Sequence, residues 1–138
     1  MIKMASKTTA KAQPDTTVIM AAEATEKLAL TASVNLEPKE FTTGSKGFRF
    51  LGKFATSDGE RFQADGNVIL VGSKDNPAAT VTALQADVAA QLAALVRLEA
   101  HTMQFSTGST GLFSQGKLTA GGQKFQVSAK AVRIRKTA

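Results

Sequence analysis

Polar and hydrophobic residues alternate with a period of two along several stretches of the chain. In residues 48–54, Phe48, Phe50 and Phe54 fall on one side of an extended chain, and Arg49 and Lys53 fall on the other. Such alternation is typical of a β-strand with one buried face. Further stretches that alternate in this way, and therefore predict strands, are 28–36, 62–70, 112–118 and 125–131.

A helical period replaces this alternation in the middle of the chain. Val81, Leu84, Val88, Leu92 and Leu95 recur at the spacing of one helix face. The preceding sequence, Asp-Asn-Pro at 75–77, is typical of a helix N-terminus. The pattern predicts one main helix over residues 77–100. Its apolar stripe would pack on a sheet or on the same helix of a second chain.

Two segments carry nearly the same sequence. Thr43–Lys53 reads TGSKGFRFLGK, and Thr107–Lys117 reads TGSTGLFSQGK, 64 positions later. With one residue dropped, GERFQ at Gly59 then matches GQKFQ at Gly122. All eight phenylalanines lie within the two copies. We therefore expect two copies of one strand–turn–strand–turn–strand unit, at about 41–72 and 105–136.

Glycines mark the expected turns within each copy. Gly-Ser at 44–45 and 108–109, Asp-Gly at 58–59 and Gly-Gly at 121–122 are turn sequences. Gly52 and Gly116 fall inside strands, where glycine indicates a bulge or a bend that curves the sheet. The predicted fold is α+β, a duplicated and curved antiparallel sheet with the main helix between the copies.

Length and composition fit one compact domain. The 138 residues divide into a flexible basic arm at 1–15 and a single domain at 16–138 that contains both repeats. The chain has no cysteine, which excludes a disulfide scaffold, thiolate metal sites and thiol catalysis, and is compatible with a reducing cytoplasm. Apolar runs are shorter than a membrane span requires, and we expect no secretory signal.

Catalytic motifs are weak. Each copy contains G-x-x-x-x-G-K, but Phe54 and Leu118 stand where a phosphate-binding loop needs Ser or Thr, and strands are predicted where that loop needs a helix. His101 is the one histidine, and no motif supplies a nucleophile or carboxylate partner for it. We therefore expect neither an enzyme nor a bound metal or cofactor.

The charge of the chain favours nucleic acid as a partner. The formal net charge is +6, and basic residues bind nucleic acid by neutralising phosphates and releasing counterions. Single strands are held by basic grooves combined with aromatic side chains that stack on bases. By strand parity, Phe113 is the best stacking candidate because it shares a face with lysine. The candidate interface is Lys46, Arg49, Lys53, Arg61, Phe113, Lys117 and Lys124, with Phe48 and Phe50 as further stacking candidates.

Two resemblances extend this interpretation. Lys46–Leu51, KGFRFL, resembles the first ribonucleoprotein motif of cold-shock domains, which would imply an OB-like barrel as the alternative fold. The pattern F-x-T-G-S-x-G…G-K…G-x-x-F-Q resembles hairpins of small phage and bacterial single-stranded-DNA-binding proteins with the curved sheets of the PC4/Whirly architecture. That resemblance implies that hairpin strands hold DNA and that helices form a dimer interface. The helix between the two copies departs from the pattern.

The sequence thus predicts non-catalytic binding of single-stranded nucleic acid, DNA with RNA as the alternative, by a cytoplasmic homodimer or higher homo-oligomer. Replication or recombination in a phage or a bacterium is the corresponding role, in the host cytoplasm if the protein is of phage origin. The alternative is a structural or assembly protein, such as a phage or shell component, whose repeated hairpins make subunit contacts. Under that alternative the lysines are solvated surface residues.

Overall fold

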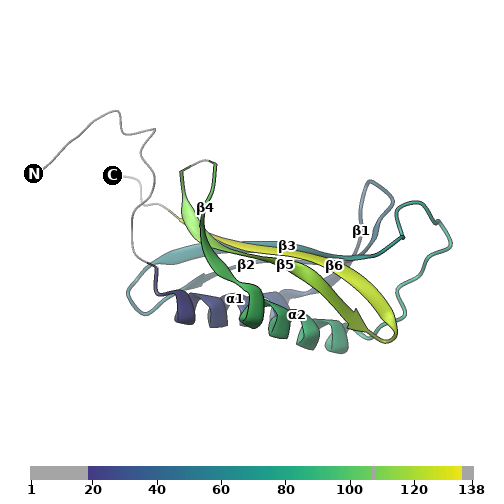
Figure 1. Cartoon of the computed structure of the whole chain (residues 1–138), viewed down its shortest axis with the longest axis horizontal. Helices are drawn as coiled ribbons and strands as arrows, with labels where there is room; N and C mark the ends of the chain where they lie inside the picture. Colours follow the sequence, from purple (N-terminus) through teal and green to yellow (C-terminus); the bar gives the residue numbers. More distant parts are fainter. Residues whose placement is uncertain (1–18, 107, 135–138) are drawn as a thin grey trace, which may run out of the picture.

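The described part of the chain forms one six-stranded antiparallel sheet with two helices on the same side of it (Figure 1). The computed structural model describes residues 19–106 and 108–134, so the predicted arm at 1–15 lies outside the described residues. The elements are α1 (Ala21–Asn35), β1 (Glu37–Glu40), β2 (Lys46–Ala55), β3 (Arg61–Leu70), α2 (Gln85–Glu99), β4 (His101–Gln104), β5 (Thr110–Ala120) and β6 (Gln123–Arg133).

The strand order β1-β2-β3-β6-β5-β4 places β3 and β6 at the centre of the sheet and the two short strands at its edges. The two central strands pair antiparallel, with Val68 opposite Val127. The predicted α+β class is confirmed. The sheet is open, because β1 and β4 do not pair with each other, and the alternative of an OB-like barrel is therefore wrong.

The strand predicted at residues 28–36 is wrong, since residues 28–35 belong to helix α1. The stretch LALTASVNL fits period two, but the buried side chains follow the helical period, at Ala24, Leu28, Ala29 and Ala32. Leu30 and Val34, which the strand interpretation would bury, are exposed. Short apolar runs are ambiguous between the two periods, and the alanine-rich sequence before Leu28 allows the helix to form.

Helix α2 begins at Gln85, eight residues later than the predicted start at Pro77. The intervening backbone is held by side chains instead. The Nζ of Lys46 donates to the carbonyl oxygens of Pro77 and Ala79, at 2.9 and 2.6 Å. The side-chain amide of Gln123 accepts hydrogen bonds from the backbone N–H groups of residues 82 and 83 and donates one to the carbonyl oxygen of residue 80. These tertiary bonds satisfy backbone groups that a longer helix would have paired internally.

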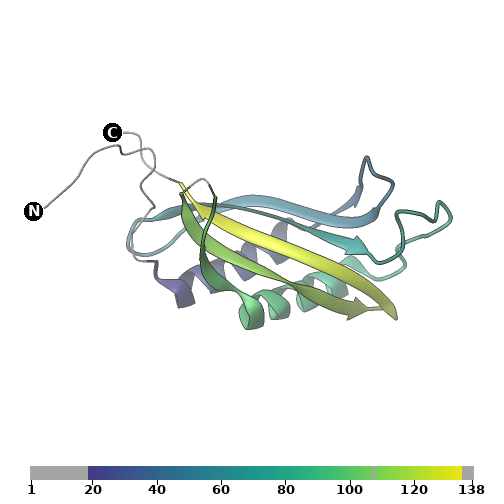
Figure 2. The same cartoon turned by 45° about the horizontal axis from the view of Figure 1, so that its top comes forward.

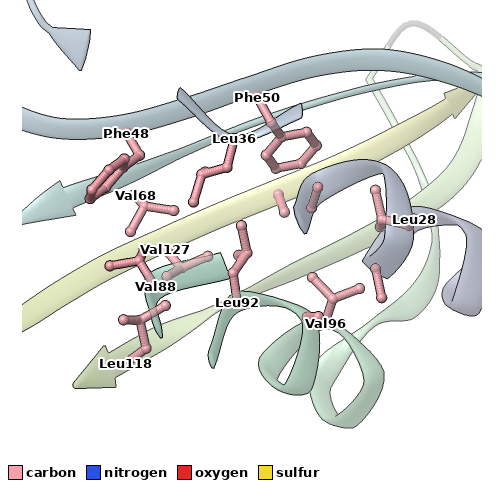
Figure 3. Packing of buried hydrophobic residues seen from close by; sticks show 14 of the residues in the cluster. Leu28, Leu36, Phe48, Phe50, Val68, Val88, Leu92, Val96, Leu118 and Val127 are labelled. Carbon is pink, nitrogen blue, oxygen red and sulfur yellow. The ribbon is translucent and has the colours of Figure 1, made fainter. Parts of the chain in front are cut away.

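The core lies between the helices and one face of the sheet (Figure 3). Phe50, Phe62 and Phe125 from the strands and Leu28 and Leu92 from the helices are fully buried. Burying each such side chain stabilises the fold by about 1.5–3 kcal/mol. Val88 and Leu92, in the middle of the predicted apolar stripe of α2, are therefore covered within the chain by the sheet and by α1, whereas Leu84 near its start is 68% exposed.

The predicted turns are confirmed, and of the two alternatives predicted for Gly52 and Gly116, a bulge or a bend, the bulge is wrong. Gly44 and Gly108 have φ of +94° and +90°, which is the region that glycine tolerates best. The register of β2 with β3 and of β5 with β6 runs unbroken through Gly52 and Gly116. These two glycines instead allow the helices to approach: a Cβ on Gly52 would lie 2.7 Å from Cγ2 of Thr31 on α1.

Gly66 gives a test of this packing. A Cβ there would lie 2.5 Å from Cε2 of Phe50 and 2.6 Å from the Ser128 carbonyl oxygen. We expect Gly66→Ala to lower the free energy of unfolding by about 1–3 kcal/mol, because the Phe50 ring has to shift in a filled core. Urea denaturation measures the change. Ser128→Ala, on the other face, should stay within about 0.5 kcal/mol of wild type; equal urea midpoints for the two variants would contradict the packing.

Candidate nucleic-acid interface

One face of the sheet is not covered by any described helix (Figures 1 and 2). We call it the open face and define it by the alternate positions of the four long strands that point away from the core. These are residues 47–55 of β2, 61–69 of β3, 111–119 of β5 and 124–132 of β6, taken every second residue. An antiparallel sheet can leave one face in water when that face is polar.

The open face is strongly basic. It carries six cationic side chains against one carboxylate, that of Asp65; the cations are Arg49, Lys53, Arg61, Lys117, Lys124 and Lys130. The two helices have the opposite balance, with four carboxylates and two cations, Lys27 and Arg97. The protein therefore presents positive charge on one side, and this asymmetry would orient a polyanion toward the sheet.

The six cations have no partner within the part of the chain that the structure describes. None of their side chains forms a hydrogen bond or an ion pair there. Three cations away from the open face are bound, by contrast. Arg97 contacts Glu26 at 2.9 Å, Arg133 contacts Glu60 at 2.8 Å, and Lys46 donates to the carbonyl oxygens of residues 77 and 79. The open-face cations are thus available to an external anion.

A row of residues crosses the open face from β2 to β4. The strand register brings Leu51, Asp65, Lys130, Phe113 and His101 side by side in that order. Phe113 is half-buried, and the His101 ring meets it edge-on, with centroids 6.1 Å apart and planes at 80°. Leu51, at the other end, is 54% exposed. The charged side chains of Asp65 and Lys130 thus lie in the middle of the row. The exposed Leu51 side chain is at one end of it, and the rings of Phe113 and His101 are at the other end.

Most of the residues predicted from the sequence meet on this face. Arg49, Lys53, Arg61, Phe113, Lys117 and Lys124 lie there, joined by Lys130. Sequence reasoning missed His101 as a neighbour of Phe113, because no local pattern marks residues 101–104 as a strand beside β5.

Phe48, Phe50 and Lys46 are corrected by the structure. Phe48 and Phe50 are 3% and 1% exposed and lie in the core (Figure 3), so their rings are not available to stack on bases. Both residues are an even number of positions from Phe54, so their side chains point to the same side of β2 as that ring, which is the helix side. Lys46 is on that same side, where its hydrogen bonds hold the loop before α2.

The resolved titration shifts lie away from the open face. The hydrogen bond from Arg97 lowers the pKa of the Glu26 carboxyl on α1, and the Thr56 hydroxyl lowers the pKa of the Asp58 carboxyl in the β2–β3 turn. A hollow of about 630 Å³ between β1, β2 and residues 79–85 shares Gly47 with this face but is lined by none of its six cations. Among the described residues, no three His, Asp or Glu side chains gather as metal ligands.

Comparisons with protein families, with curated proteins and with solved structures found no match to this chain. Within the described residues, neither helix is long and apolar enough to cross a membrane.

Proposed function

We propose that this protein binds single-stranded DNA on the open face of its sheet, without catalysis. The observation that carries the proposal is the set of six cations that have no partner among the described residues, on a sheet face that no described helix covers. Phosphate groups would neutralise these cations, and bases would contact Phe113 and Leu51. We propose a role in replication or recombination, in the cytoplasm of a bacterium or of the host of a phage, and action as a homo-oligomer.

The arrangement of helices and charges favours a single strand over a duplex. Duplex readers commonly place a basic helix in the major groove, whereas α1 and α2 carry more carboxylates than cations and lie on the opposite side of the sheet. A single strand exposes the faces of its bases, and base–aromatic stacking needs no particular sequence. Phe113, beside Lys130, supplies both an aromatic surface and a nearby cation.

We infer that the two halves of the chain arose by duplication of an α–β–β–β unit. The 64-residue offset that relates the two glycine-rich segments also relates α1 to α2 and β1 to β4. It relates the buried residues of the helices too: Ala24, Leu28, Ala29 and Ala32 correspond to Val88, Leu92, Ala93 and Val96. The turn hydrogen bonds of Phe41 and Phe105 are likewise the same. On this inference the repeat unit includes a helix and begins earlier than residue 41.

Salt dependence tests the phosphate contacts. Lys53→Ala and Lys117→Ala should each weaken binding to a labelled poly-dT of about 30 nucleotides, and each should reduce the slope of log K against log salt by about 0.7, the value for one phosphate contact on a single strand. Fluorescence anisotropy over a range of salt concentrations measures this slope. The matched control is Lys27→Ala on α1, which has the same charge change and should bind as wild type.

Equal weakening by Lys27→Ala would show that only net charge matters and would contradict an interface on the open face. Failure of the folded wild-type protein to bind poly-dT at low salt would contradict the function itself. That second result would favour the structural or assembly role.

Replacement of Phe113 tests base stacking separately from charge. We expect Phe113→Leu to weaken poly-dT binding by about 5- to 150-fold, the equivalent of about 1–3 kcal/mol for one stacked base, with the salt slope unchanged. Phe54→Leu, on the helix side of β2, is the matched control and should leave affinity unchanged. A Phe113→Leu variant with wild-type affinity would exclude stacking on this ring.

A further inference from the structure

The two edges of the sheet differ in the chemistry of their outermost strands. β1 reads Glu-Pro-Lys-Glu, and β4, 64 residues later, reads His-Thr-Met-Gln. Both pair with the neighbouring strand in the same register: Pro38 lies opposite Phe48, and Thr102 lies opposite Leu112. All four side chains of β4 are exposed, and no described strand pairs with its outer edge.

Proteins commonly block exposed strand edges with proline and charged side chains, because unpaired backbone groups otherwise invite another strand. β1 carries both features, with Pro38 and three charged residues. β4 carries no proline, lysine, arginine or carboxylate. Because both strands hold the same position in the two halves, the comparison shows which edge is protected and which is not.

The hairpin geometry identifies the backbone groups that β4 presents outward. The Phe105 N–H donates to the Ser109 carbonyl oxygen at 2.8 Å, so residue 105 bonds within its own hairpin. In an antiparallel pair successive residues alternate between inward and outward bonding. Thr102 and Gln104 therefore direct their N–H and C=O groups away from β5. The same alternation turns Pro38 outward in β1, where its missing N–H costs no bond to β2.

We propose that β4 pairs antiparallel with β4 of a second copy of this chain. The two outward residues, Thr102 and Gln104, lie two positions apart. A two-fold axis that is perpendicular to the sheet and passes beside Met103 therefore places each of them opposite the other one in the second copy. Thr102 then exchanges both backbone hydrogen bonds with Gln104 of the partner subunit, and Gln104 does the same with Thr102 of the partner subunit. Neither β4 strand contains a lysine, arginine or carboxylate that would place like charges opposite each other in this pair.

A second copy of β1 could not pair in this way. Pro38 would leave a carbonyl oxygen of the partner without a donor, and the two Lys39 side chains would meet at the axis. This contrast, together with the self-complementary outward groups of β4, argues for a second copy of the chain as the occupant of the β4 edge.

The two-fold axis keeps the two open faces on the same side of the joined sheet. The row that contains Phe113 and His101 ends at β4, so it would lie beside the seam in both subunits. This consequence rests on the proposed function, because a shared face matters only if a nucleic acid crosses it. The strand pairing itself does not depend on nucleic acid.

Cysteine cross-linking tests the pairing directly, because the chain has no cysteine of its own. Directly opposed residues that do not exchange hydrogen bonds have Cα atoms about 4.5 Å apart, within the range for a disulfide. Met103→Cys should therefore form a disulfide-linked dimer under mild oxidation without DNA. Lys39→Cys, at the same position on β1, is the matched control and should stay monomeric. Leu30→Cys, at an exposed position of α1, would form a disulfide-linked dimer if two copies met through their helices, and we expect it to stay monomeric.

Sedimentation of the full chain without DNA completes the test. The wild-type mass should rise with concentration from 14.4 kDa toward twice that value. Thr102→Pro, which copies the tolerated Pro38, should raise the dissociation constant by about tenfold or more. A monomer at every concentration without a Met103→Cys cross-link overturns the proposal, whether the edge is bare or covered by the chain's own first residues. The proposal is also overturned if the Leu30→Cys variant forms the cross-linked dimer and Thr102→Pro leaves the dissociation constant unchanged.

Discussion

The antiparallel pairing of β3 with β6 is the interaction on which the rest of the structure depends. It joins two α–β–β–β segments into one sheet and brings both helices to the same side, where Val68 and Val127 face each other at the centre of the core. A single helix layer can cover only one face of a sheet. No described helix covers the other face, so most of its residues are free of the packing constraints that act on the core.

The chemistry of the two sides follows from this arrangement. Most buried side chains toward the helices are phenylalanine, leucine, valine or alanine, and Gly66 lies where the Phe50 ring of the neighbouring strand fills the space. The open face instead carries six long cationic side chains that form no hydrogen bond or ion pair with the described residues. Lys46 shows the difference within one strand: its side chain lies on the helix side of β2 and hydrogen-bonds a loop, whereas the Lys53 side chain lies on the open face and forms no hydrogen bond or ion pair with the described residues. Strand parity thus separates structural lysines from those available to a ligand.

The parts of the fold that the sequence predicted are those governed by local periodicity. The long strands and the glycine turns followed from period two and from turn chemistry, and parity alone placed Arg49, Lys53, Phe113 and Lys117 on one face. Helix α1 was missed because its apolar residues fit both periods over a short stretch. The start of α2 was misplaced because tertiary hydrogen bonds from Lys46 and Gln123 hold the preceding residues in a loop.

The short edge strands and the β3–β6 pairing have no local signal at all. They depend on contacts between residues that lie far apart in the sequence, and this is why the row from Leu51 to His101 and the open edge of β4 became visible only in the structure.

Lysine footprinting would test the central claim, that the open face is the binding surface, most directly. The protein would be acetylated with and without saturating poly-dT at low salt, and each lysine would be quantified by mass spectrometry. The account predicts protection of Lys53, Lys117, Lys124 and Lys130, with Lys27 on α1 modified equally in both samples. Protection of Lys27, with the open-face lysines as reactive as in the free protein, would contradict it.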